Sequence, residues 1–209
     1  MGTKSNISLL GFRRRMMLAV TDKKPDYSTW RGVFIEDIDG NLYTEAEWDG
    51  TKTANGIAVL TDECRFVMAL QYAKTSVGWG GYSVYVNEIT TVDTESKAKK
   101  DYDGEIQTTA ILNQINDTTN AAYYCREFTF PNGKKGYLGA AGEWWAVLNN
   151  KDAIKTALTK CGGIEMRNSA HWTSTQNDST YSWTADWKNI CLLAFPKDTS
   201  GSARAFCEI

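Results

Sequence analysis

Residues suited to binding another molecule gather in one stretch near the C-terminus, residues 170–206. Three of the chain's eight tryptophans lie there, namely Trp172, Trp183 and Trp187. Between 183 and 188, the apolar residues Trp183, Ala185 and Trp187 alternate with Thr184, Asp186 and Lys188. In a β-strand this alternation places the apolar side chains on one face and the polar side chains on the other. We therefore predict a packed face and, opposite it, a recognition surface held on a rigid frame.

Histidine chemistry would depend on His171, because the chain has one histidine. A metal site with two histidine ligands is thereby excluded, and a Ser-His-Asp triad would have to use this residue. His171 stands beside Trp172 at the start of the polar stretch. We predict an exposed recognition residue there rather than a catalytic base, and we predict no enzymatic activity.

Closely spaced carboxylates offer two other chemistries. Asp101 and Asp103 would suit the acid pair of a glycoside hydrolase, but they lie in a lysine-rich polar stretch that is typical of a solvated loop. Asp186 with Asn177 and Asp178 would suit calcium, which prefers oxygen ligands. We predict no required metal and no cofactor.

The cysteines and glycines favour structural roles. The number of cysteines is odd and no CxxC pair occurs, which favours reduced thiols over disulfides or zinc. They are Cys64, Cys125, Cys161, Cys191 and Cys207. The glycine-rich stretch 136–142 lacks the Lys-Ser/Thr pair of a phosphate loop and the spacing of a dinucleotide fingerprint. We predict that it leads into a helix with Trp144 or Trp145 packed inward.

Turn residues and periodicity divide the chain into short elements. The pair Asp39-Gly40 between the apolar runs 34–38 and 42–44 predicts a hairpin. Core strands are expected over 57–60 and 66–70, and helices over 106–115, 142–148 and 152–158. The run 121–128 is expected to form a short helix or a turn. Gly162-Gly163 should end the last helix, and strands and loops should follow from Ala170 onward.

Composition limits the class of protein. A chain of 209 residues with 42% hydrophobic residues supports one packed domain, here 31–209, with a short N-terminal arm, 1–30. A formal charge of −2 provides no long-range field for nucleic acid or for an anionic membrane. No apolar run approaches the roughly 20 residues of a membrane span, so we predict no membrane insertion. The run Arg13-Arg14-Arg15 before Met16 is a poor secretion signal, because the apolar stretch after it is short.

The C-terminal motifs carry a family resemblance. Trp172-Thr173-Ser174-Thr175, then Trp183-x-Ala185-x-Trp187, then Ala203-Arg204-Ala205-Phe206 resemble the end of a C-type-lectin-fold domain. More narrowly, they resemble the variable proteins of diversity-generating retroelements in bacterial and prophage genomes. The stretches 55–60, 79–80 and 136–144 resemble other blocks of this group, so the resemblance covers roughly residues 31–209.

The resemblance implies an α+β, C-type lectin-like fold, with two helices on small twisted antiparallel sheets and long irregular loops. It also implies a variable surface within 170–206 on an unchanging scaffold. The variable surface is expected to comprise Ala170, His171, Asn177, Asp178, Thr180, Tyr181, Thr184, Asp186, Lys188, Asn189, Cys191 and Leu193. The scaffold is expected to comprise Trp172, Trp183, Trp187, Arg204 and Phe206, with Arg204 in an ion pair to Glu143.

The function that the resemblance implies is receptor binding at the tip of a phage tail fibre. The partner would be a bacterial surface protein or glycan, and the place of action the virion, after cytoplasmic assembly. A homo-oligomer is expected, a trimer if the protein caps a fibre. A bacterial cell-surface adhesin is one alternative, and an oxidase related to formylglycine-generating enzymes is another. That oxidase would need a cysteine pair or metal-binding histidines, and the Glu-Pro-Asn and Trp-Asn-Asp signatures of calcium-dependent sugar binding are absent.

Overall fold

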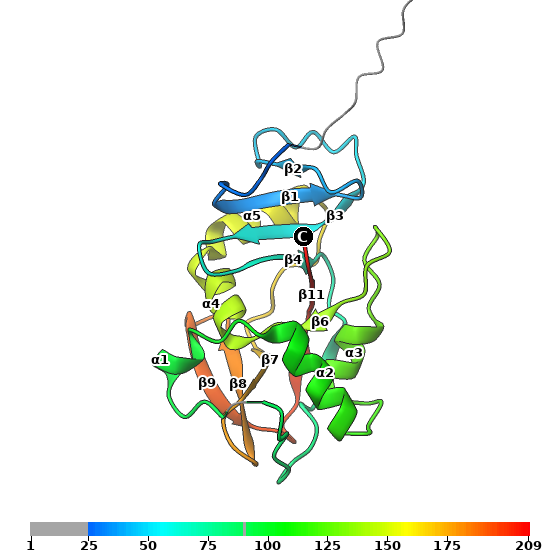
Figure 1. The fold of residues 1–209 in the computed structure, drawn as a ribbon. Coiled ribbons are helices and arrows are strands. Elements are labelled where there is room, and N and C mark those ends of the chain that lie inside the picture. Colours follow the sequence, from blue (N-terminus) through cyan, green and yellow to red (C-terminus); the bar gives the residue numbers. More distant parts are fainter. Residues whose placement is uncertain (1–24, 90) are drawn as a thin grey trace, which may run out of the picture.

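The computed structural model describes residues 25–89 and 91–209, whose strands form two sheets with helices packed against them (Figure 1). The larger sheet has six strands in the order β2-β1-β3-β4-β11-β6, and all of its pairings are antiparallel. Its strands are β1 Gly32–Asp37, β2 Leu42–Tyr43, β3 Ala54–Leu60, β4 Arg65–Ala69, β6 Tyr137–Leu138 and β11 Ala205–Cys207.

The smaller sheet has five strands in the order β5-β10-β7-β8-β9. These strands are β5 Lys74–Val77, β7 Ala170–Gln176, β8 Tyr181–Asp186, β9 Cys191–Pro196 and β10 Gly201–Ala203. Most pairings are antiparallel, but β10 runs parallel to β7, with Ser202 opposite His171. The residues expected to bind a ligand therefore belong to this sheet and its turns.

Five helices occur in the described part of the chain. They are α1 Glu95–Ala98, α2 Gly104–Gln114, α3 Ala121–Glu127, α4 Ala141–Asn149 and α5 Lys151–Lys160. The predicted helices over 106–115, 142–148 and 152–158 are confirmed as α2, α4 and α5, and the run 121–128, expected as a helix or a turn, forms the helix α3. The end of α5 is also as predicted, because Gly162 has a φ of 67° and the amide of Gly163 donates to Leu158 O at 2.8 Å.

The hairpin from β1 to β2 forms at the predicted turn. Asp37 Oδ1 accepts the amides of Asp39 at 3.0 Å and Asn41 at 2.8 Å. Gly40 has a φ of 74°, a left-handed conformation that glycine adopts at little cost. The aspartate and the glycine thus fix the turn together.

Two hydrophobic cores lie on opposite faces of the central strands. On β3, Ile57 and Val59 belong to one core, whereas Ala58 and Leu60 belong to the other. Helices α4 and α5 pack on the first side and helices α2 and α3 on the second (Figure 1). The resemblance implied a fold with two helices on the sheets. The structure has a second pair, α2 and α3, which buries the second face of the larger sheet.

The fold is a mixed α+β arrangement with largely antiparallel sheets. The proposed N-terminal arm, 1–30, falls mostly outside the described residues, which exclude 1–24. Tyr27 is already bound to the domain, since its carbonyl accepts Arg65 Nη2 at 2.7 Å and its hydroxyl accepts the Leu42 amide at 3.1 Å.

Truncation of Trp183 should destabilise the protein strongly. Its indole is 5% exposed and donates to Val92 O at 2.8 Å, so Trp183→Ala creates a cavity and removes one of the two side-chain donors to that carbonyl. We expect a loss of about 3–5 kcal/mol in the free energy of unfolding. Lys188→Ala, at an exposed position two residues beyond β8, should stay within about 0.5 kcal/mol. Urea titration of both variants measures the contrast, and similar small losses would contradict it.

Candidate recognition surface

The structure divides the twelve expected surface residues into three groups. Six lie together where β8 ends and β9 begins, and we call them the turn patch: Ala170, Asp186, Lys188, Asn189, Cys191 and Leu193. Four lie at the hairpin between β7 and β8, and we call them the hairpin patch: Asn177, Asp178, Thr180 and Tyr181. The remaining two, His171 and Thr184, are fully buried.

Strand register places the turn patch on one face of the sheet. Asp186 pairs with Ala170 on one side and with Cys191 on the other, so the three side chains form a row across β7, β8 and β9. Leu193, two residues along from Cys191 and therefore on the same face, is 39% exposed. Lys188 and Asn189 extend the surface into the exposed turn.

The turn itself is held by Asp186. Its Oδ1 accepts the amides of Lys188 at 2.9 Å and Asn189 at 3.0 Å, and its Oδ2 accepts Asn189 Nδ2 at 2.8 Å. Partial burial opposes ionisation, but these bonds outweigh it and hold the pKa of Asp186 below its usual range. Asp186 therefore fixes the turn, rather than standing free as the sequence pattern indicated.

Asp178 does the same for the hairpin patch. Its Oδ1 accepts the amides of Thr180 at 2.6 Å and Tyr181 at 2.7 Å, while Asn177 Nδ2 donates to Val92 O at 3.0 Å. Tyr181 is 39% exposed. The two patches stand at opposite ends of β8, about 17 Å apart for five residues of extended chain. One small ligand could not cover both.

The expected exposure of His171 is wrong. The ring lies against Trp144, with centroids 5.1 Å apart, and its Nε2 is 3.1 Å from the hydroxyl of Tyr72. Burial, and after it the charge of Arg204, lowers the pKa of His171 to about 4. The imidazole is therefore neutral and structural at physiological pH.

The expected exposure of Thr184 is also wrong, because this residue is fully buried. The sheet is covered on both faces here, so the alternation along β8 separates two buried sides rather than a buried side from solvent. Thr184 Oγ1 donates to Leu193 O at 3.0 Å. Neither His171 nor Thr184 can contact a ligand from this arrangement.

All five expected scaffold residues are buried. The indole of Trp172 donates to Val77 O at 2.8 Å, which ties β7 to β5, and Phe206 stacks on Phe66 with centroids 4.6 Å apart. The others are Trp183, Trp187 and Arg204.

The partner expected for Arg204 is wrong. Its guanidinium lies over the ring of Tyr72, 4.3 Å from the centroid, and donates to Ala69 O at 3.2 Å and Ile164 O at 2.7 Å. Glu143 is used elsewhere: it accepts the amide of Ala140 at 2.7 Å at the start of α4 and the hydroxyl of Tyr137 at 2.6 Å. Arg204 therefore satisfies backbone carbonyls instead of a carboxylate.

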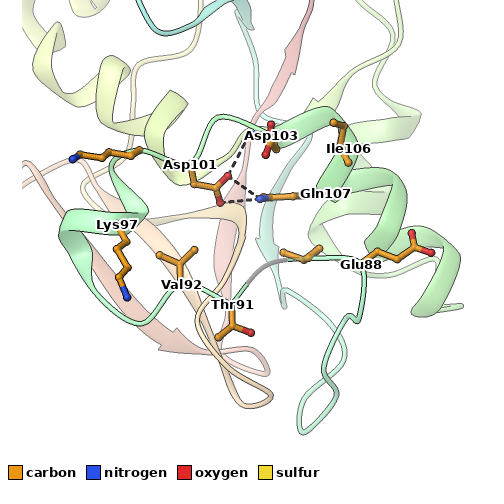
Figure 2. A pocket seen from close by; sticks show the side chains of 10 residues that line it. Glu88, Thr91, Val92, Lys97, Asp101, Asp103, Ile106 and Gln107 are labelled. Carbon is orange, nitrogen blue, oxygen red and sulfur yellow. Dashed lines mark hydrogen bonds between the residues drawn. The ribbon is translucent and has the colours of Figure 1, made fainter.

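A cleft that sequence reasoning missed lies between α1 and α2 (Figure 2). Its volume is about 460 Å³ and its lining includes Asp101 and Asp103, which the sequence had indicated as solvated loop residues. Figure 2 shows Asp101 and Gln107 meeting in the middle, with Lys97 on one side and Glu88 on the other. The only sequence signal was the spacing of Asp103 and Gln107, which places them one helical turn apart.

The described residues contain no group of side chains suited to a metal ion and no disulfide. Across 25–89 and 91–209, no three or more His, Cys, Asp and Glu side chains are grouped as a metal site would require. All five cysteines lie in these ranges and are free thiols. No helix in the same ranges has the length and hydropathy to cross a membrane.

Comparison with known proteins gives a fold and nothing narrower. No protein-family profile matches the chain, and no curated protein matches its sequence. The crystal structure of a fimbrial protein from Bacteroides ovatus resembles it, with a TM-score of 0.61 and 15% identity, over 86% of this chain. The match covers 49% of the fimbrial chain, so this chain spans about half of its length. At this identity the likeness establishes the shared α+β fold alone.

Replacement of His171 by glutamine should flatten part of the pH dependence of stability. The folded-state pKa of about 4 lies below the unfolded value of 6.5, so between these values the unfolded chain binds a proton that the folded chain does not. The native protein should thus lose about 3 kcal/mol relative to His171→Gln as the pH falls from 6.5 to 4.

Denaturant titrations of both proteins across this range measure the difference. Glu143, whose pKa burial raises to about 8, titrates in the opposite sense but is present in both proteins and cancels. Above pH 7 the difference should be constant. A difference that is also constant from 6.5 to 4 would contradict a neutral buried His171.

Proposed function

We propose that this chain is a binding protein that recognises a bacterial surface molecule, a protein or a glycan, through the turn patch. One observation carries the proposal: the exposed side chains of Lys188 and Leu193 are not needed to hold the backbone. Lys188 and Leu193 are exposed and make no side-chain hydrogen bond among the described residues, while the Asp186 carboxylate fixes the turn. A surface built in this way can change its chemistry while its shape is retained.

Binding rather than catalysis is the better-supported role. His171, the one base that a triad could have used, is buried against Trp144 and Tyr72. An oxidase of the formylglycine-generating type would need a cysteine pair or histidine ligands, and the described residues contain five free thiols and this one histidine.

We further propose that the domain is a C-type-lectin-type variable protein of a diversity-generating retroelement, working at the tip of a phage tail fibre. The support is that the residues of the C-terminal motifs are buried, as the resemblance implies for a scaffold. The motif residues Trp172, Trp183, Arg204 and Phe206 are buried, whereas five of the six turn-patch residues lie between Trp183 and Arg204 in the chain. Several copies on one fibre, in a trimer, would raise a weak affinity by roughly 10²–10⁴ through multivalency.

A bacterial cell-surface adhesin is the second candidate. The observation in its favour is the fold shared with the fimbrial protein from Bacteroides ovatus. Both candidates assign the same task to the turn patch, and they differ in whether the domain belongs to a virion or to the cell surface.

Randomising the turn patch should change binding while folding is retained. We expect most members of a library varied at Ala170, Lys188, Asn189, Cys191 and Leu193 to fold, because Lys188, Asn189 and Leu193 are exposed and Ala170 and Cys191 are only half-buried. Display of the library, sorted first for folding and then for binding to intact bacterial cells, should yield members with new targets.

A second library serves as the matched control. Varying Thr173, Ser174 and Thr175, which are buried on the adjacent strand β7, should abolish folding in most members. If folded members of the first library all kept the parent's target, the turn patch would not be the recognition surface.

The flanking DNA separates the two candidates. A variable protein of a retroelement requires a near-copy of the codons for residues 170–206 beside a reverse transcriptase gene, differing mainly at adenines. We expect sequencing of the locus to find both, with the differences at codons of the turn patch and hairpin patch. A locus with fimbrial genes and without the near-copy would favour the adhesin.

A further inference from the structure

The basic run near the N-terminus has no part in the function proposed above. Arg13, Arg14 and Arg15 are followed at once by the apolar run 16–20, which reads Met-Met-Leu-Ala-Val. Residues 1–24 hold six of the chain's 23 Lys and Arg residues and one of its 25 Asp and Glu residues, which leaves 17 and 24 in residues 25–209. The first 24 residues therefore carry a formal charge of +5 and the remainder −7. Charges of this size and of opposite sign attract one another.

The chain enters the domain across one face of the larger sheet. Tyr27 and Trp30 pack against the core that contains Ala58 and Leu60, and the centroids of the Trp30 and Phe34 rings are 5.1 Å apart. The Tyr27 hydroxyl accepts the Leu42 amide. The residues that precede Pro25 therefore join the domain beside the hairpin of β1 and β2, two residues before a side chain that is fixed on this face.

A groove of about 450 Å³ opens directly beside Tyr27. Tyr27 itself and Leu42, which is 5% exposed, form part of its lining. Ile38 and Ile209 also line it and are still 42% and 40% exposed. Burial of these apolar side chains against an apolar segment would stabilise the domain.

The charges of the groove favour a basic occupant. The carboxylates of Glu36 and Asp39 line it, and Asp39 makes no ion pair among residues 25–89 and 91–209. One ammonium group, that of Lys134, lines the groove too and donates to a backbone carbonyl at 2.8 Å. Asp39 stands on the hairpin turn that Asp37 holds in place. The groove thus offers apolar walls and a fixed carboxylate.

Connectivity selects the occupant. Residue 20 lies seven residues before Tyr27, a span of at most about 24 Å, so the run 16–20 can turn back into a groove of which Tyr27 forms a wall. A tether this short gives an effective concentration on the order of millimolar, which a separate partner would have to match. Methionine side chains adapt to irregular apolar surfaces. Lys23 and Lys24 lie between the run and the groove, where one of them can reach Asp39.

We propose that residues 16–20 dock in this groove of their own chain, against Ile38 and Ile209, with Lys23 or Lys24 beside Asp39. The N-terminal segment then closes over the edge of the larger sheet as part of the domain. Its apolar residues are buried within one chain rather than against a neighbouring copy. This docking does not depend on the turn patch, which belongs to the other sheet.

Oxidation of methionine by hydrogen peroxide tests the proposal on the full chain, because a buried thioether reacts more slowly than an exposed one. Met16 and Met17 should oxidise at least roughly 5-fold more slowly in buffer than in urea, and so should Met68, which is fully buried. Dilution from roughly 100 μM to roughly 1 μM should leave the rates in buffer unchanged, because the contact is intramolecular. Mass spectrometry of the peptides measures each rate.

Two variants locate the contact. Ile38→Lys removes an apolar contact and adds a positive charge, so Met16 and Met17 should oxidise roughly 5-fold faster than in the parent. Asp39→Lys should act in the same direction. The matched control is Ile190→Lys, because Ile190 is 43% exposed and lies in the turn between β8 and β9. It should leave both rates unchanged.

Met68 reports whether each variant is folded, so if Ile38→Lys exposes Met68, Asp39→Lys decides. The proposal is overturned if Met16 and Met17 oxidise as fast in buffer as in urea, or if the folded groove variants keep the parent's protection. It is also overturned if protection disappears on dilution, because a second copy would then supply the segment. None of these results bears on binding by the turn patch, so the two proposals fail separately.

Discussion

Strand β7 is the constraint on which the rest of the structure depends, because both of its faces are buried. Every residue from His171 to Gln176 is inaccessible to solvent, and most of them are polar. Such residues are stable in a core only when each polar group has a partner. The partners come from other segments: Thr173 Oγ1 donates to Trp183 O, Thr175 Oγ1 accepts the Ala141 amide at the start of α4, and Ser174 Oγ donates to Gln107 on α2.

These bonds make the polar motif of β7 a structural junction. Gln176 extends it to the loops, since its Oε1 accepts the amide of Val86 at 2.9 Å and Lys197 Nζ at 2.9 Å. The same ammonium group donates to Val84 O and lies 4.4 Å from the centroid of the Trp79 ring. One buried strand therefore positions α4, α2 and the loop that contains Val84 and Val86, and substitutions in it would disturb all three.

The sequence predicted those features that local chemistry decides. Gly40 and Gly162 marked a turn and a helix end because their backbone conformations are left-handed, and Trp183 stood out as core by size and alternation. Thr184 was misjudged because period-two alternation does not reveal whether the second face is covered. His171 was misjudged because its place at the start of a polar stretch does not reveal whether the strand is covered. That cover comes from residues far away in the chain. The cleft was missed for the same reason, since its lining combines residues that are separated in the chain, such as Glu88, Lys97 and Gln107.

The placement of the two candidate surfaces follows from the same junction. The turn patch lies at the far end of β8 from the hairpin, and its turn is fixed locally by Asp186 without help from the strand's buried polar groups. Changes there leave the junction intact. The cleft, in contrast, rests on Ser174 through Gln107, so its shape is tied to a buried residue of β7. A chain arranged in this way can combine one surface that tolerates substitution with another whose geometry is set by the core.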